Sequence, residues 1–275
     1  MSTNKSLGKA VRVLKLFSAH EPRLSVTEIS LRLDIPKSTT HNILKSLQAE
    51  GLIEKVDGDA YALGTDIIAL SQSVRVNVEI RDRAAPHIRA LADLAGESVY
   101  LTIKEADHIL YIYAVESSRR LIARTAVGDR MYMHSTGVGK AILGHLPEDE
   151  VRGIAERTGL PAITSHTMTD VEKLLDEARA IKARGYSLDA GENEVGNYCI
   201  GAPIYGPRRN VIGGCSIAGT DPEIIGKRAP ELSRALLSTA LDISRNLGYV
   251  PSNIAHVAIS SPRHDGASRQ DVHRG

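Results

Sequence analysis

The sequence is short of residues on which several classes of protein depend. Its 275 residues include no tryptophan, one phenylalanine and two cysteines. Two cysteines are too few for a disulfide scaffold, and so few aromatic side chains argue against base stacking as the main way of holding single-stranded nucleic acid. The sequence contains no apolar run of about 18 residues, so it predicts no membrane span. The formal net charge of +1 excludes a globally basic coat, so any contact with DNA must be local.

The amino-terminal segment has no apolar core followed by a small-residue cleavage site, so we expect no secretory signal. We therefore expect a soluble, cytoplasmic protein. A length of 275 residues predicts one large domain or two smaller ones, and a hydrophobic share of 42% is enough to bury a core. The polar segment 251–275 has no hydrophobic pattern, and we expect it to be disordered.

The first 65 residues contain, in order, the elements of a winged helix-turn-helix. Ser25 and Glu28 have the spacing of a capping box, which predicts the start of a short helix that ends before Pro36. Asp57-Gly58 joins two β-prone runs and predicts a hairpin. The expected elements are helix 7–19, helix 26–33, helix 37–50 and the hairpin strands 52–56 and 59–63. Residues 66–78 contain no glycine or proline, which favours a linker helix.

The predicted helix 37–50 presents a small, polar and basic face. Its core side carries Thr40, Ile43, Leu44 and Leu47, and no acidic residue lies between Asp34 and Glu50. On the opposite face, Asn42 can pair with adenine and Lys45 can donate to guanine or to a phosphate. The candidate DNA-contacting residues are Lys37, Ser38, Thr39, His41, Asn42 and Lys45. An ordinary solvated helix has the same pattern, but the order of the surrounding elements favours binding to double-stranded operator DNA.

Two features limit how strongly one copy of this segment can hold DNA. Asp57 and Asp59 at the hairpin tip repel phosphate, so the wing is not expected to grip the backbone. Residues 1–65 carry nine lysines and arginines against seven aspartates and glutamates. We therefore expect a dimer, in which each copy binds one DNA half-site and the two binding free energies add.

From residue 80 onward the pattern is that of an α+β domain with mostly antiparallel strands. Residues 80–95 have helical spacing, with a kink or restart expected at Pro86. The expected strands are 98–103, 108–115, 122–126, 186–190, 199–205 and 211–218. The expected helices are 137–146, 148–157, 169–184 and 222–247.

The segment His134–Lys140 is rich in glycine and precedes a predicted helix. Free backbone N–H groups at a helix start can hold an anion, although a plain helix cap explains the same residues equally well. A P-loop is excluded by His134 and Ala141, and a dinucleotide fingerprint is excluded by Ile142.

Enzymatic and metal-binding alternatives find little support. Residues 214–218 nearly match a nucleophile elbow around Ser216, but Ala218 replaces the final glycine, so a hydrolase is a weak alternative. Cys199 could act as a nucleophile or as a redox sensor, yet both it and Cys215 lie in apolar strand runs, which favours burial. The histidines and cysteines show no zinc-ligand spacing. We therefore expect no catalytic residue, metal or cofactor.

Several motifs together resemble the IclR family of bacterial transcription regulators, over roughly residues 6–250. They are Ser6-Leu7-Gly8-Lys9-Ala10-Val11-Arg12-Val13-Leu14, Pro36-Lys37-Ser38-Thr39-Thr40-His41-Asn42-Ile43-Leu44, Glu50-Gly51-Leu52-Ile53, His134-Ser135-Thr136-Gly137-Val138-Gly139-Lys140-Ala141, Cys199-Ile200-Gly201-Ala202-Pro203-Ile204 and Ser216-Ile217-Ala218-Gly219. The resemblance implies a winged helix-turn-helix over 1–65, a linker helix over 66–79 and a GAF-like effector domain over 80–250. It also implies dimers, often assembled to tetramers.

The resemblance further implies a ligand-responsive regulator, expected to be a repressor, with a pocket for a small organic acid. The pocket residues that it implies are Gly137, Asp189, Cys199 and Ser216, and the loop N–H groups add Val138 and Gly139. Ala218 stands where many relatives have a second serine, which removes one hydroxyl donor. Asp189, Cys199 and Ser216 have the chemistry to meet hydroxyl or keto groups of a ligand.

Overall fold

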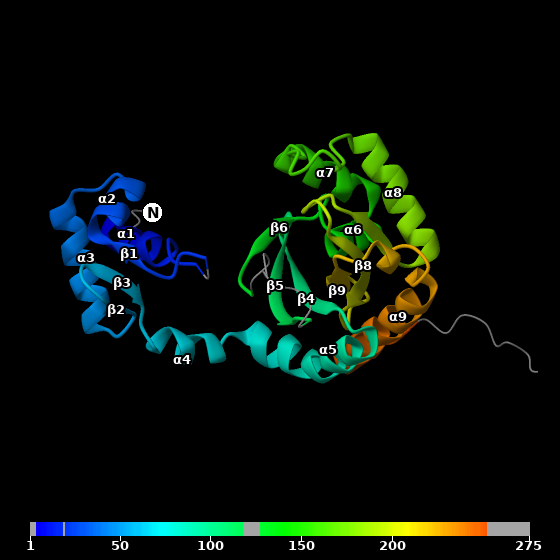
Figure 1. Ribbon diagram of the computed structural model, residues 1–275, viewed down its shortest axis with the longest axis horizontal. Helices are drawn as coiled ribbons and strands as arrows, with labels where there is room; N and C mark the ends of the chain where they lie inside the picture. The colour runs from blue at the N-terminus through cyan, green and yellow to red at the C-terminus, as the bar shows by residue number, and fades with distance from the viewer. Residues whose placement is uncertain (1–3, 19, 118–126, 252–275) are drawn as a thin grey trace, which may run out of the picture.

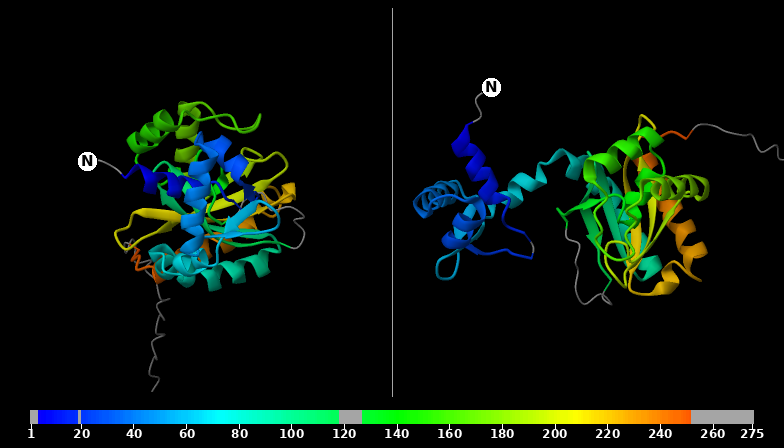
Figure 2. Two further views of the ribbon diagram at one scale, coloured as in Figure 1. Left: turned by 90° about the vertical axis from the view of Figure 1, so that its left-hand side faces the viewer. Right: turned by 90° about the horizontal axis from the view of Figure 1, so that it is seen from above.

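The computed structural model describes residues 4–18, 20–117 and 127–251, except for the side chains of residues 77 and 78. Figure 1 shows an amino-terminal domain and a carboxy-terminal domain joined by a helical segment, and the right-hand view of Figure 2 shows the same separation from above. The predicted strand 122–126 and nearly all of the tail predicted to be disordered lie outside the described residues.

The amino-terminal domain is the predicted winged helix-turn-helix. Its elements are α1 (Lys5–Leu14), β1 (Leu24–Ser25), α2 (Val26–Leu33), α3 (Lys37–Ala49), β2 (Ile53–Lys55) and β3 (Ala60–Leu63). The Ser25–Glu28 capping box is present: the Ser25 N–H donates to Glu28 Oε2 at 2.7 Å, and the Glu28 N–H donates to Ser25 Oγ at 3.3 Å. The core includes Val13, Leu24, Ile29, Leu44 and Tyr61.

Two boundaries in this domain differ from the prediction. Helix α1 begins at Lys5, because Asn4 caps it by accepting from the N–H groups of Ser6 and Leu7, and it ends at Leu14 rather than near residue 19. The two-residue strand β1 was not predicted, since its pairing with β3 is a long-range contact that local periodicity does not reveal.

The linker is less regular than predicted. Helix α4 (Asp66–Gln72) stops, a π-helical turn follows at Asn77–Arg81, and α5 runs from Asp82 to Ala95. At the break, the hydroxyl groups of Ser71 and Ser73 donate to the carbonyls of Ile68 and Leu70, so they compete with the backbone for helix acceptors. The helix 66–78 is therefore interrupted without glycine or proline.

Of the kink or restart predicted at Pro86, the restart is wrong, because Pro86 lies inside α5. A wider π turn lies immediately before α5. Pro86 has no backbone N–H group, so it cannot donate to a carbonyl of the preceding turn.

The carboxy-terminal domain is a six-stranded antiparallel sheet between helices, in the strand order β6-β5-β4-β9-β8-β7. Its strands are β4 (Ser98–Glu105), β5 (His108–Val115), β6 (Arg130–Tyr132), β7 (Ser187–Ala190), β8 (Tyr198–Tyr205) and β9 (Val211–Gly219). Its remaining helices are α6 (Gly137–Leu143), α7 (Glu148–Thr158), α8 (Val171–Arg184), a short 3-10 turn (Pro222–Ile224) and α9 (Ala229–Asn246). The α+β class is confirmed.

Each face of this sheet has its own core. Helices α5 and α9 pack on one face through residues such as Ile88, Ile217 and Leu236, and α6, α7 and α8 cover the other face through residues such as Ile142 and Leu175 (Figure 1). Two details differ from the prediction. Strand β6 was not expected, and the long helix expected over 222–247 is a 3-10 turn and α9, with Gly226 between them.

None of the helices among the described residues is both long and apolar enough to cross a membrane.

Candidate functional site

Helix α3 exposes the face that the sequence predicts for DNA. Thr40, Leu44 and Leu47 are buried, which confirms the core side of the helix. On the outer side, the exposed candidates are Lys37, Ser38, His41, Asn42 and Lys45, and Thr39 is half-buried. Within the described part of the chain, neither Lys37 nor Lys45 forms an ion pair, so both ammonium groups are available to an external anion.

The start of α3 is held rigidly against α2. Asp34 has a left-handed backbone (φ 50°), and the Ser30 hydroxyl donates to the carbonyl of Ile35 at 2.6 Å. Pro36 provides no side-chain cap for α3. The first N–H groups of α3 therefore have no capping side chain among the described residues, which suits a DNA phosphate.

The wing carries its acidic residues as ion pairs. Arg23 lies 3.5 Å from Asp57, and Lys55 lies 3.5 Å from Asp59, with all four side chains largely exposed. These exposed pairs contribute little stability, but they offset the negative charge at the hairpin tip. The wing is therefore close to neutral.

A small cavity lies between α6 and the sheet, where the effector pocket is predicted. It is lined by Tyr100, Tyr111, Thr136, Gly137, Val138, Asp189, Asn193, Asn197, Cys199, Ser216 and Ala218. Five of the six predicted effector-binding residues are among them, and Gly139 is not. Its volume of about 20 Å³ has room for about one water molecule, far below the roughly 300 Å³ of a typical small-molecule site.

The start of α6 is already occupied by internal acceptors. The Gly137 N–H donates to Asp189 Oδ2 at 3.2 Å, and the Gly139 N–H donates to the Thr136 hydroxyl at 3.2 Å. The N–H of Lys140 donates to the Thr136 carbonyl, and that of Val138 to the Cys199 sulfur. The prediction of free N–H groups is therefore wrong for this structure, because Asp189, Thr136 and Cys199 accept from them.

The glycines of this loop allow close packing. A Cβ atom on Gly137 would lie 2.6 Å from Cys199 Sγ, and one on Gly139 would lie 2.4 Å from the Met133 Cα. Every residue of α6 is buried. Gly139 therefore allows α6 to pack closely against Met133 and Thr136. It faces these residues and not the cavity.

Buried charged residues lie at and near the cavity, of which Asp189 lines it. The Lys140 ammonium donates to the Glu192 carboxylate, with 2% of the lysine side chain and 11% of the glutamate side chain exposed. Burial raises the pKa of Asp189 and of Glu192, although the nearby Lys140 opposes both shifts. Among the described residues, Glu192 Oε2 and Asn197 Oδ1 are buried without a hydrogen-bond partner. Asn197 also lines the cavity, so its oxygen can accept from a ligand.

The cysteines do not have the properties of redox sensors. Both Cys199 and Cys215 are buried, and burial raises the pKa of each thiol to about 12. A reactive thiol is instead accessible and has a lowered pKa. Ser216 lies within β9, opposite Gly201 of β8, and not at a strand-to-helix turn. Among the described residues, no three histidine, cysteine, aspartate or glutamate side chains are grouped to hold a metal ion.

Sequence reasoning missed four polar residues of the cavity that lie outside the His134–Lys140 segment. Tyr100 and Tyr111 make an edge-to-face contact with ring centroids 5.7 Å apart, and Asn193 and Asn197 come from the loop between β7 and β8. Only the loop gave a signal, since its seven residues after Ala190 include one apolar side chain, Val195. The tyrosines are brought in by strand pairing between β4 and β5.

Comparison with known proteins agrees with this architecture. Residues 6–57 match the family described as "IclR helix-turn-helix domain", and residues 72–245 match "Bacterial transcriptional regulator IclR C-terminal". The chain is 32% identical over 246 residues to the HTH-type transcriptional regulator KipR of Bacillus subtilis, covering 90% of this chain and 98% of KipR. It is 30% identical to the HTH-type transcriptional repressor AllR of Escherichia coli K12, covering 89% and 90% of the two chains.

The fold also matches solved structures. An IclR homolog from Microbacterium hydrocarbonoxydans, crystallised with 4-hydroxybenzoate, superposes with a TM-score of 0.79. The two sequences are 21% identical, and the match covers 88% of this chain and 98% of the other. At that identity the likeness concerns the fold alone.

Proposed function

The chain belongs to the IclR family of bacterial transcriptional regulators and is a ligand-responsive DNA-binding protein, and from this premise we propose that it is a repressor whose operator affinity a small organic acid controls. Its relative AllR is a repressor, which supports the sign of the regulation. The relatives are transcriptional regulators, and we propose that this chain likewise catalyses no reaction. We assign 1–65 to DNA binding, 66–79 to the linker and 80–250 to effector binding.

The observation that carries the DNA-binding assignment is the exposed, acid-free face of α3 with its uncapped start. We assign base contacts to Asn42 and Lys45, and phosphate contacts to Lys37, Ser38, Thr39 and His41. Asn42→Ala is expected to weaken binding to the chain's own promoter fragment by about 1–3 kcal/mol, because one bidentate base contact is lost. Fluorescence anisotropy at fixed salt measures this, with Gln48→Ala as the exposed control on the same helix. Equal affinities of the two variants would contradict the assignment.

For the effector we assign the cavity formed by Gly137, Val138, Asp189, Cys199 and Ser216. A ligand with a carboxylate and a hydroxyl group suits it, because Ser216 supplies a donor and Asn197 Oδ1 needs one. The 4-hydroxybenzoate bound by the Microbacterium protein has this chemistry. The small volume implies that the cavity opens on binding.

Two measurements test the effector assignment. Hydroxybenzoates, keto acids and sugar acids are screened by thermal shift, since a ligand of the folded state raises the unfolding midpoint. The acid that raises it should also weaken promoter binding, and Asn197→Ala should abolish both effects. An acid that stabilises Asn197→Ala as strongly as the wild type would show that it binds elsewhere.

Self-association is proposed from the exposed apolar residues of the amino-terminal half. Helix α4 has seven residues and buries none of them, while Ile68 and Leu70 are 62% and 57% exposed. A helix this short has little stability in water by itself. We therefore propose that a second copy of the chain covers its exposed apolar side chains. Leu7 and Val11 on α1 are also exposed. We propose a dimer through this half, which can assemble further to a tetramer. Sedimentation of Ile68→Lys, with loss of the dimer, tests it.

A further inference from the structure

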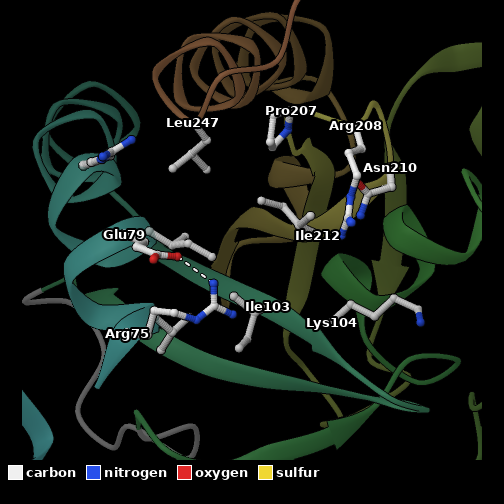
Figure 3. A pocket seen from close by; sticks show the side chains of 12 residues that line it. Arg75, Glu79, Ile103, Lys104, Pro207, Arg208, Asn210, Ile212 and Leu247 are labelled. Carbon is white, nitrogen blue, oxygen red and sulfur yellow. Dashed lines mark hydrogen bonds and ion pairs between the residues drawn. The ribbon is translucent and has the colours of Figure 1, made fainter. Parts of the chain in front are cut away.

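A second cleft lies far from the α6 cavity, where the linker meets the carboxy-terminal domain. Its volume is about 700 Å³, within the range of small-molecule sites. The π-helical turn of the linker, strand β4, the turn between β8 and β9, and the end of α9 form its walls (Figure 3). The residues at its base belong to the core of the α5–α9 face of the sheet, whereas the α6 cavity lies on the opposite face.

The floor of this cleft is aliphatic. Ile80, Ile103, Ile212 and Leu247 line it, and each remains partly exposed to solvent. These side chains come from four segments that are distant in the sequence. Covering this floor with an apolar group is favourable, because apolar surface is removed from water. The floor has no polar group that could bind a small inorganic anion.

The rim of the cleft is cationic. It carries four basic side chains and one acidic side chain, Glu79. Glu79 pairs with Arg75 at 2.8 Å, and Lys104 pairs with Glu150 at 3.0 Å. Neither of the other two bases, Arg83 and Arg208, forms an ion pair with a carboxylate among the described residues, but Arg83 donates to the carbonyl of Asn246 at 3.4 Å. Figure 3 shows Arg75 and Arg208 on opposite sides, with Ile103 and Ile212 between them.

We propose that this cleft binds an amphipathic organic anion, a carboxylate with an aliphatic chain. Its carboxylate pairs with Arg208, and its chain covers the isoleucines of the floor. The Arg208 guanidinium, which has no carboxylate partner among the described residues, lies beside an apolar floor. This combination selects amphipathic anions over phosphate, which lacks an apolar part, and over neutral lipids, which lack the charge.

Occupation of the cleft joins two parts of the molecule. Arg75 and Glu79 lie just after the break that follows α4, and Arg208 lies on the turn between β8 and β9. An anion held between them restrains the segment that connects the DNA-binding domain to the sheet. This binding site stands apart from the effector cavity, so either assignment can fail without the other.

Octanoate is the probe for this proposal. Calorimetric titration of the full chain should show saturable binding in the range of about 1 mM or tighter. Acetate, which lacks the chain, and octanol, which lacks the charge, should each bind at least about tenfold more weakly. Hydrogen exchange of residues 73–83 should slow when octanoate is bound.

Matched variants locate the site. Arg208→Gln should weaken octanoate binding at least about fivefold, because a charge-assisted hydrogen bond is lost. The neighbouring Arg209→Gln, which removes the same charge outside the cleft lining, should leave binding unchanged, as should Ser216→Ala in the α6 cavity. The proposal is overturned by the absence of saturable binding, by equal losses in the two arginine variants, or by loss of binding in Ser216→Ala. It is also overturned if Arg208→Gln weakens promoter binding or changes the sedimentation coefficient without octanoate.

Discussion

Replacing Lys140 by methionine is expected to destabilise the carboxy-terminal domain, and more so at neutral pH than in acid. The Lys140 ammonium is almost completely buried and has the Glu192 carboxylate as its partner. Removal of one member of a buried pair leaves the other charge without compensation, which costs about 3–5 kcal/mol. For a domain of this size, a loss of about 3 kcal/mol lowers the unfolding midpoint by roughly 6–12 °C.

The pH dependence follows from the carboxylate that remains. Burial raises the pKa of Glu192 above its ordinary value of 4.5, and Lys140 opposes that rise, so the methionine variant raises the pKa further. At pH values between the ordinary and the raised pKa, Glu192 is protonated in the folded variant and ionised in the unfolded chain. Its stability therefore falls as the pH rises through this window, by up to about 1.4 kcal/mol per pH unit.

Urea unfolding at about pH 5 and about pH 8 measures both effects. Lys182→Met, which changes an exposed lysine of α8, is the control and should stay within about 0.5 kcal/mol of the wild type. The double variant Lys140→Met/Glu192→Gln should recover most of the loss at pH 8, because no uncompensated charge is left at this pair. A loss below about 1 kcal/mol, or one that is equal at the two pH values, would refute the reasoning.

Three further predictions concern packing, the thiols and the helix cap. Gly137→Ala should cost about 1–3 kcal/mol in thermal unfolding, because its Cβ would lie 2.6 Å from a sulfur, whereas Gly8→Ala, with open space around it, should be neutral or stabilising. Cys199 and Cys215, whose pKa values are raised to about 12, should react with a disulfide reagent only on unfolding; rapid labelling of the native chain would revive a redox role. Ser25→Ala should lower the stability of the amino-terminal domain by about 0.5–2 kcal/mol in urea, and an unchanged midpoint would show that the capping box contributes nothing.

Local patterns predicted the amino-terminal domain well, because its signals act over a few residues. The capping box of Ser25, the hairpin at Asp57-Gly58 and the buried side of α3 depend only on neighbours in the sequence. Strand β1 and strand β6 were missed because each is stabilised by pairing with a distant strand. The break after α4 was missed because serine hydroxyl groups, rather than glycine or proline, compete for the helix carbonyls there.

For the cavity beside α6, the sequence named most of the lining residues that we assign to the effector, but not their geometry. Sequence motifs and the family resemblance pointed to Gly137, Asp189 and Ser216, and all three line it. They could not indicate that Asp189 itself accepts from the start of α6, because that contact joins residues 52 positions apart. Nor could they reveal the buried Lys140–Glu192 pair, since a lysine in a helix is ordinarily exposed.

On the proposed assignment, the position of Asp189 sets the sensitivity of the regulator. A carboxylate tethered at the start of α6 is an internal competitor that is present at constant effective concentration, whatever the cell contains. An incoming acid reaches the same donors only in the fraction of molecules in which Asp189 has withdrawn, so its apparent dissociation constant is raised by that fraction. Trace concentrations of the acid therefore leave the effector site empty, and the regulator responds only when the acid accumulates.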